Sequence, residues 1–220
     1  MKYAFFIAGT DTEIGKTHAA CALLHAFRAR GMSALGMKPV AAGVDETGEN
    51  EDVRRLREAS TTPAPPALVN PWCFADPVAP HIAAREAGAT IDAPTAQAAL
   101  SALGELAEVV LVEGVGGFLV PLDEAGGFDA ADLAAALGLP VILVVGMRLG
   151  CLNHALLTQE AIAHRGLKLA GWIANRIDPH MLRFDENLDT LRARLRAPLL
   201  GVIPHGADAA EAAACLTLPV

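Results

Sequence analysis

The chain has 220 residues, of which 53% are hydrophobic and 19% are charged, with a formal net charge of −8. This composition is typical of a compact globular protein, and the length suits one α/β domain spanning residues 1–220.

The acidic balance argues against nucleic acid as the main partner, because neutralising a phosphate backbone needs a basic face. The longest apolar runs, such as 141–145, are too short to cross a bilayer, so we expect no membrane partner. The apolar start of the chain leads directly into a glycine loop without a cleavage site, which predicts a cytoplasmic location.

Apolar runs and helical patterns alternate along the chain. Strands are predicted at residues 2–8, 34–38, 108–113, 140–146, 168–174 and 199–203. Helices are predicted at 17–30, where Gly31 is a natural C-cap, from Asp52 onward, and at about 77–87, 94–107, 129–138, 153–165 and 180–196. Strands that are apolar throughout are buried on both faces, and their alternation with helices predicts right-handed crossovers. The predicted fold class is therefore α/β, a three-layer structure with a parallel sheet between two layers of helices.

The segment GTDTEIGKT, residues 9–17, joins the first predicted strand to the first predicted helix. Its last three residues match the phosphate-binding pattern G-x-x-x-x-G-K-[ST], in which the lysine contacts phosphate and the hydroxyl contacts Mg²⁺. Position 10 is threonine where that pattern has glycine, so the literal match fails. The strand–loop–helix context favours a phosphate site, because a helix N-terminus offers free N–H groups to an anion. The alternative is that Lys16 is a surface lysine at the start of a helix.

Polar residues follow several predicted strands, at the edge where parallel sheets bind ligands. Glu113 ends the third strand and is a candidate Mg²⁺ ligand, although a carboxylate there can also be a solvated loop charge. Lys38 ends the second strand just before Pro39, and it either serves a site or extends along the surface to water. Asp52 opens a helix, where the helix dipole favours an acid even without a site.

The cysteines and histidines indicate no metal centre. Cysteine occurs at positions 21, 73, 151 and 215, without the C-x-x-C spacing of a zinc site or the arrangement of a disulfide framework. The histidines are scattered without metal-ligand spacing. We therefore assign neither residue type a metal role.

Seven segments taken together resemble dethiobiotin synthetases, the ATP-dependent ligases of biotin biosynthesis. They are GTDTEIGKT (9–17), GMKPVAAG (36–43), NPWCFADPVAPH (70–81), LVEGVGG (111–117), LPVILVVGMRLGCLNHALLT (139–158), LAGWIAN (169–175) and APLLGVIP (197–204). The resemblance runs from residue 5 to about residue 206 and implies the fold of the P-loop NTPases. The loop of this family has threonine at the place of Thr10, which accounts for the departure from the general pattern.

The resemblance implies that 7,8-diaminononanoate, CO₂ and ATP are converted to dethiobiotin, ADP and phosphate. An amine adds to CO₂ as a carbamate, the carbamate oxygen takes the γ-phosphoryl group, and the second amine closes the ring. Such phosphoryl transfer depends on positioning and on charge stabilisation. The resemblance further implies Mg²⁺ as cofactor, ATP as co-substrate, and a homodimer with shared active sites.

Site residues follow from the resemblance by position. Lys16 and Lys38 correspond to catalytic lysines, the first at the β- and γ-phosphates and the second facing the carbamate. The metal ligands correspond to Thr17, Asp52 and Glu113. The nucleotide-binding residues correspond to Glu13, Ile14, Gly15, Lys16, Thr17, His18, Asp52, Glu113, Gly114, Val115, Gly116, Asn175, Arg176, Pro204, His205, Gly206 and Glu211. Among these, Asn175 is expected at the adenine edge and Glu211 at the ribose. The substrate-binding residues correspond to Thr12, Lys38, Ala42, Gly150, Cys151, Leu152 and Asn153, with the loop 150–153 supplied by the partner subunit.

Two positions depart from the pattern of the family. Ala42 replaces the serine of KPVASG, which removes a hydroxyl contact to the diamine worth ~1 kcal/mol. Arg176 follows Asn175 where aspartate is frequent, so the choice of base stays open and other nucleoside triphosphates are candidate donors.

Two other functions are alternatives. Amide-forming synthetases of the cobalamin type carry a glutaminase domain, for which this chain has no spare length. Partitioning ATPases typically carry an additional lysine early in the loop and often a membrane-binding C-terminal helix. This chain has Thr10, Asp11 and Thr12 at the first of these places, and it lacks both features.

Overall fold

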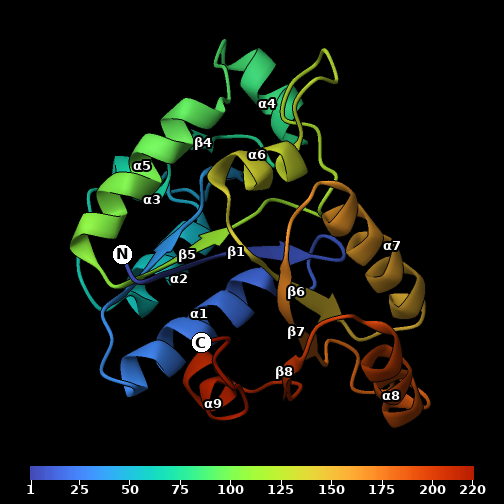
Figure 1. Cartoon of the computed structure of the whole chain (residues 1–220). Helices are drawn as coiled ribbons and strands as arrows, with labels where there is room; N and C mark the ends of the chain where they lie inside the picture. The colour runs from blue at the N-terminus through green and yellow to red at the C-terminus, as the bar shows by residue number, and fades with distance from the viewer.

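The computed structural model describes residues 1–220 and contains a parallel sheet of six strands in the order β2-β5-β1-β6-β7-β8 (Figure 1). All neighbouring strands in this sheet run parallel. Their bounds are β1 (Tyr3–Gly9), β2 (Ala34–Met37), β5 (Val109–Glu113), β6 (Val141–Gly146), β7 (Leu169–Asn175) and β8 (Leu199–Ile203). The six strands predicted from apolar runs are confirmed, each within one residue at either end.

Helices cover both faces of this sheet, as Figure 1 shows. One face carries α1 (Lys16–Ala29), α2 (Glu51–Ala59) and α9 (Ala209–Ala214). The other carries α5 (Ala93–Leu106), α6 (Ala130–Leu137), α7 (Cys151–His164) and α8 (Phe184–Arg194). The neighbours Phe5 and Phe6 of β1 belong to the two different cores, because successive side chains of a strand point to opposite faces. The predicted three-layer α/β fold is confirmed.

Helix α1 ends as its sequence predicts. Gly31 adopts the left-handed conformation with φ 74°, and its N–H donates to the carbonyl oxygen of Arg28 at 2.9 Å. The N–H of Met32 donates to the carbonyl oxygen of Phe27 at 3.2 Å, which completes a helix-terminating turn that favours glycine. The helix therefore has a fixed length between the phosphate loop and β2.

A second, smaller sheet was not predicted. It pairs β3 (Val40–Ala42) with β4 (Trp72–Phe74) in parallel, and α3 (Pro66–Val69) and α4 (Pro80–Glu86) flank β4 along the chain. Strands of three residues are too short to show a period in the sequence. The helix expected from residue 77 begins at Pro80, because proline is tolerated in the first turn of a helix but not further inside.

The starts of two other helices differ from the prediction, and one further helix was not predicted. Helix α8 begins at Phe184 rather than at residue 180, because Arg183 adopts a left-handed conformation with φ 55° that interrupts the helix. Helix α7 begins at Cys151, two residues earlier than expected. Helix α9 was not predicted, and its six residues depend on a capping box between Asp208 and Glu211. None of the helices has both the length and the hydrophobicity that crossing a membrane requires.

Candidate active site

A cavity of about 340 Å³ opens at the carboxyl ends of β1, β2 and β5. Its walls come from the loop after β1, the start of α1, the segment after β2, the start of α2 and the segment after β5. They comprise Thr12, Glu13, Gly15, Lys16, Thr17, His18, Lys38, Ala42, Asn50, Asp52, Arg55, Glu113, Val115 and Gly116. All of these except Asn50 and Arg55 are among the predicted site residues. The separate segments of the chain that carry the predicted phosphate, metal and carbamate residues therefore meet at one place.

The loop between β1 and α1 holds Lys16 over the cavity. Gly15 precedes α1 in a left-handed conformation with φ 84°, which favours glycine. The Lys16 ammonium donates to the backbone carbonyl of Asp11 at 2.9 Å, so the side chain folds back along its own loop. Burial lowers the pKa of Lys16 to about 8, because the protein gives the charged form less solvation than water does. An anion placed beside this ammonium would restore that stabilisation.

Four polar side chains form a connected cluster at the floor of the cavity. The Thr17 hydroxyl donates to Oε1 of Glu113 at 2.8 Å. The Lys38 ammonium donates to the same oxygen at 2.7 Å and to Oδ2 of Asp52 at 2.9 Å. Burial alone would lower the pKa of Lys38, but the carboxylates of Glu113 and Asp52 outweigh it and raise that pKa. Lys38 is therefore a fixed positive charge at neutral pH.

The cluster suits Mg²⁺ completed by phosphate oxygens. Oε2 of Glu113 is buried and has no hydrogen-bond partner, which is costly for a carboxylate unless a cation or donor meets it. No group of three or more His, Cys, Asp or Glu side chains converges as a complete metal site. Mg²⁺ binds through one or two carboxylates together with water and substrate phosphates, so Thr17, Asp52 and Glu113 match its requirements.

The backbone of Lys38 is clamped by the segment between α3 and β4. The N–H of Lys38 donates to the carbonyl oxygen of Val69 at 2.8 Å. The side-chain amide of Asn70 donates to the carbonyl oxygens of Lys38 at 2.6 Å and of Trp72 at 3.0 Å. Asn70 thus fixes where the Lys38 side chain starts, a role that was not predicted from the sequence.

Two lining residues were not predicted. Asn50 caps α2 by accepting the N–H of Val53 at 3.2 Å, and its amide donates to the carbonyl oxygen of Gly43 at 2.7 Å. Arg55 stands three residues after Asp52, so both share one face of α2. That spacing is the signal in the sequence that could have found Arg55.

A family model described as an AAA domain matches residues 3–213. The ATP-dependent dethiobiotin synthetase BioD of Aromatoleum aromaticum is 64% identical over 221 residues, covering 98% of this chain and 97% of that protein. The chain belongs to the ATP-dependent dethiobiotin synthetase family. A second dethiobiotin synthetase of this family, BioD from Ralstonia nicotianae, is 53% identical over 208 residues, covering 93% of this chain and 90% of that protein.

Solved structures of more distant proteins share the fold. The septum site-determining protein MinD of Pyrococcus horikoshii, complexed with Mg-ADP, aligns with a TM-score of 0.59 at 16% identity, covering 93% of this chain and 82% of that chain. A ParA family ATPase from Chlorobium tepidum aligns with a TM-score of 0.58 at 11% identity, covering 97% of this chain and 90% of that chain. At these identities the likeness concerns the fold alone, a parallel sheet with helices on both faces.

The residues expected at the base of the nucleotide lie beside the cavity rather than in its lining. Asn175 ends β7, is buried, and donates its amide to the carbonyl oxygen of Ile14 at 2.8 Å, which ties β7 to the phosphate loop. The guanidinium of Arg176 stands 4.8 Å from the centre of the Phe184 ring and donates to the carbonyl oxygen of Pro179 at 3.3 Å. Arg176 thus packs toward α8 and its preceding loop.

The turn after β8 carries the remaining predicted nucleotide residues. Pro204, His205 and Gly206 connect β8 to α9, and Nδ1 of His205 lies 3.2 Å from the carbonyl oxygen of Arg176. The carboxylate of Glu211 accepts the N–H of Asp208 at 3.0 Å as part of the α9 capping box. Glu211 therefore has a structural partner in this structure.

The loop 150–153 lies outside the cavity lining of its own chain. Gly150 caps α7 in a left-handed conformation with φ 97°, Cys151 is buried, and Asn153 is exposed. The same region presents large apolar side chains to solvent, with Leu149 96% exposed, Leu157 61% and Leu119 58%. Leu119 and Leu157 line one hollow together with Phe118.

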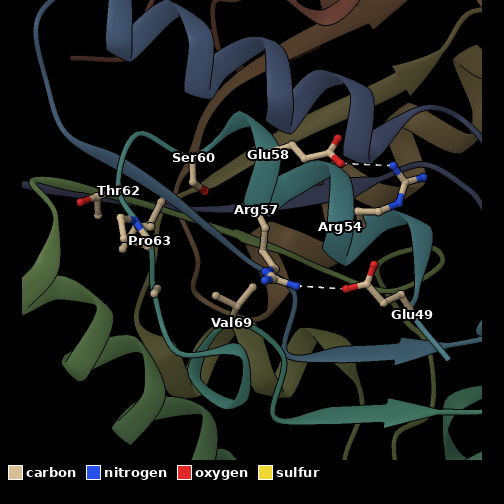
Figure 2. Close-up of a pocket in the computed structure, with 10 residues that line it drawn as sticks. Glu49, Arg54, Arg57, Glu58, Ser60, Thr62, Pro63 and Val69 are labelled. Atoms are coloured by element: carbon tan, nitrogen blue, oxygen red, sulfur yellow. Dashed lines mark hydrogen bonds and ion pairs between the residues drawn. The ribbon is translucent and has the colours of Figure 1, made fainter. Parts of the chain in front are cut away.

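Another hollow, of about 400 Å³, lies on the far side of α2 and contains none of the predicted site residues (Figure 2). Figure 2 shows Arg54 directed at Glu58 and Arg57 directed at Glu49, with N···O distances of 3.3 Å and 3.2 Å. Each arginine is about half exposed and already paired with a carboxylate. We therefore place no part of the reaction there.

Proposed function

We propose that the chain catalyses the ATP- and Mg²⁺-dependent conversion of 7,8-diaminononanoate and CO₂ to dethiobiotin, ADP and phosphate. The observation that carries this proposal is a second buried lysine, Lys38, in the same cavity as Lys16. One lysine in the phosphate loop suffices to hold a nucleotide. A second fixed positive charge suits an additional anion beside the γ-phosphate, and a carbamate is such an anion.

The proposed reaction has three bond-forming steps. One amine of the substrate adds to CO₂ and loses a proton, which gives the carbamate. A carbamate oxygen attacks the γ-phosphorus and ADP leaves, which gives a mixed carbamic-phosphoric anhydride. The second amine attacks the carbonyl carbon, phosphate leaves, and the amine proton is lost as the ring closes. When bound, Mg²⁺ neutralises charge on the β- and γ-phosphates.

Several residues of the cavity take a role in this scheme. Lys16 holds the β- and γ-phosphates and stabilises the charge that develops on transfer, while Thr17, Asp52 and Glu113 hold the metal. Lys38 and Thr12 face the carbamate. Ala42 offers the diamine a methyl group where a hydroxyl is usual, so we expect weaker substrate binding there by ~1 kcal/mol.

The nucleotide base is assigned to the surface formed by the ends of β7 and β8. One N–H of the Asn175 side-chain amide donates to the carbonyl oxygen of Ile14. The amide oxygen and the second N–H are left to contact the edge of the base. The turn 204–206 and Glu211 complete the proposed nucleoside site, with Glu13, Ile14, Gly15, His18 and the segment 114–116 around the phosphates. Because Arg176 is held by Phe184, we propose that it packs beside the base without selecting it.

We also propose that residues 1–220 work as one domain, in the cytoplasm where ATP is available, and as a homodimer. In the dimer, Gly150, Cys151, Leu152 and Asn153 of each subunit serve the substrate of the other. The exposed side chains of Leu119, Leu149 and Leu157 support this arrangement, because burying them in an interface would remove apolar surface from water.

The test compares turnover with nucleotide affinity in the Lys38→Gln variant. Dethiobiotin formed from diamine, bicarbonate and MgATP is measured by mass spectrometry, and nucleotide affinity is measured by calorimetry with a non-hydrolysable ATP analogue and saturating Mg²⁺. We expect turnover to fall at least ~100-fold, a loss typical of removing a group that stabilises transition-state charge, while affinity is retained or increased. Lys168→Gln, at an exposed position, is the control. Equal losses of turnover and affinity would contradict a substrate role for Lys38.

A further inference from the structure

Lys38 lies where the proposed metal ligands converge. Its ammonium is 2.7 Å from Oε1 of Glu113 and 2.9 Å from Oδ2 of Asp52, the two carboxylates assigned to Mg²⁺. The Thr17 hydroxyl, the third proposed ligand, donates to the same Glu113 oxygen. The side chains of Lys38 and Glu113 are 5% and 0% exposed, so water contributes little to this balance of charge.

The ammonium holds Oε1 of Glu113 and Oδ2 of Asp52, whereas Oε2 of Glu113 is buried without a partner. The carboxylate of Glu113 is 0% exposed and needs a cation beside it, because an unpaired buried charge is costly, whereas the Asp52 side chain is 39% exposed. Cations within a few ångströms of one another in a poorly solvated site repel strongly. A metal that binds Oε2 of Glu113 and reaches Asp52 would stand within a few ångströms of the Lys38 ammonium, and the repulsion between the two cations would favour displacement of the ammonium.

We propose that Lys38 is the resident cation of the metal site and that it exchanges with the divalent metal. In the metal-free protein it neutralises Asp52 and Glu113. When the metal binds these carboxylates, the Lys38 side chain turns into the cavity, where it meets an anionic substrate. The proposal rests on the metal role assigned to Asp52 and Glu113 under the proposed function.

The surroundings of Lys38 allow this exchange. Its backbone is fixed by hydrogen bonds from Asn70 and to Val69, so the movement is confined to the side chain. The same cavity is lined by Ala42 and Gly116, one with a methyl side chain and the other with no side chain. Metal binding and the movement of Lys38 toward the substrate are thereby coupled. The reaction then has a fixed order, because Lys38 is released from the carboxylates only after the metal has bound.

The first test follows the lysines of the wild-type protein by nuclear magnetic resonance with lysine-selective ¹³C and ¹⁵N labelling. The chain has only four lysines, at positions 2, 16, 38 and 168, so each side-chain signal can be assigned with a single variant. A non-hydrolysable ATP analogue is added first without metal and then with Mg²⁺. We expect the side-chain signals of Lys38 to shift on the addition of Mg²⁺, while those of Lys2 and Lys168 stay in place. If the side-chain signals of Lys38 do not shift when Mg²⁺ is added, the proposed exchange is wrong.

The second test measures Mn²⁺ binding by electron paramagnetic resonance in the absence of nucleotide and diamine. Lys38→Met keeps the length of the side chain and removes its charge. We expect this variant to bind Mn²⁺ at least ~10-fold more tightly than the wild type, because the competing cation is gone. Lys168→Met should bind Mn²⁺ like the wild type, and adding Glu113→Gln to Lys38→Met should abolish the gain. Unchanged or weaker binding by a folded Lys38→Met protein, as judged by circular dichroism, would overturn the proposal.

The two tests separate this inference from the proposed function. If Lys38→Met does not fold, the wild-type resonance experiment decides alone. If the wild type forms dethiobiotin but neither measurement shows exchange, the function stands and the exchange fails. If Mn²⁺ binding responds as expected but no dethiobiotin forms, the exchange stands and the assigned reaction fails.

Discussion

Two lysines in one cavity have pKa values shifted in opposite directions. Lys38 is surrounded by two carboxylates, which more than offset its burial and raise its pKa. Lys16 has a backbone carbonyl as its direct partner, so burial dominates and lowers its pKa to about 8. The difference lies in the partners rather than in the residue type. The charged form of Lys16 would therefore be stabilised by a nearby anion such as a phosphate.

Lys16 should therefore reduce the stability of the free protein. Its pKa is about 8 in the folded state, against 10.5 for an unperturbed lysine, so the protonated form costs roughly 3 kcal/mol at pH 7. The unfolded chain holds the proton more tightly, so this cost shrinks as pH rises from about 8 to 10.5. We expect Lys16→Met to raise the free energy of unfolding at pH 7 by about 2–3 kcal/mol, and by clearly less at a pH of about 9.5. Urea denaturation at both pH values measures this.

A comparison with Lys168→Met isolates the effect of burial, because Lys168 is exposed and its substitution should be neutral at both pH values. If Lys16→Met were destabilising at pH 7, or if its effect did not depend on pH, the charge of Lys16 would be well compensated in the folded protein.

At the scale of elements, helix α2 determines the geometry of the proposed metal site. Asp52 and Arg55 lie on this helix, and its Leu56 packs on Gly36 in β2. A Cβ added at Gly36 would stand 2.9 Å from Cβ of Leu56, which is closer than packed carbon atoms approach. The helix can sit close enough to the sheet for Asp52 to reach Lys38 because position 36 has no side chain.

Gly36→Ala should push α2 outward. We expect the free energy of unfolding to fall by about 1–3 kcal/mol, as is usual for overpacking, and the affinity for the magnesium complex of a non-hydrolysable ATP analogue to weaken. Gly104→Ala is the control, because Gly104 lies in α5 outside the cavity lining and its Cβ would stand 3.0 Å from Cβ of Met1. Calorimetry should show the loss of affinity in the Gly36 variant alone. Equal losses in both variants would indicate a general effect of instability.

At the scale of the whole molecule, one chain provides only part of the proposed active site. The phosphate loop and the metal cluster line its cavity, whereas the loop 150–153 does not. Leu119 and Leu157 border a further shallow hollow with Phe118, and Leu149 precedes α7 nearby in the chain. A two-fold dimer through this surface would give each cavity the partner's loop, because a two-fold axis applies the same contact twice.

Hybrid dimers test this arrangement. We would combine Lys16→Ala with Asn153→Glu, since Asn153 is exposed whereas Cys151 is buried and less tolerant of a charge. Each variant alone should be inactive, the second because its charge repels the substrate carboxylate. In a hybrid with shared sites, one site carries both defects and the other carries neither. Random mixing makes about half of the dimers hybrids, so about a quarter of all sites should recover activity.

Differently tagged subunits would establish that hybrids form. If tagged hybrids are isolated and no dethiobiotin synthesis returns, each loop serves its own chain and the shared site is excluded.

Much of this protein could be predicted from local patterns in its sequence. The apolar runs located all six strands of the main sheet, and Gly31 located the end of α1, because such signals depend on residues that are neighbours in the chain. Lys38 and Glu113 could be named as candidates because parallel strands bring their carboxyl ends to one edge. The segment GTDTEIGKT predicted the phosphate loop. The contacts assigned to that loop stay predictions.

Tertiary structure alone decided the rest. The sheet of β3 and β4 pairs segments that are far apart in the chain, with strands too short to show a period. The clamp of Asn70 on Lys38 and the placement of Arg55 beside the phosphate loop likewise join residues from separate elements. Above all, the bonds of Lys38 to Asp52 and Glu113 could not be predicted from the sequence. Distances between side chains on different elements depend on how those elements pack, and packing is determined by the whole chain at once.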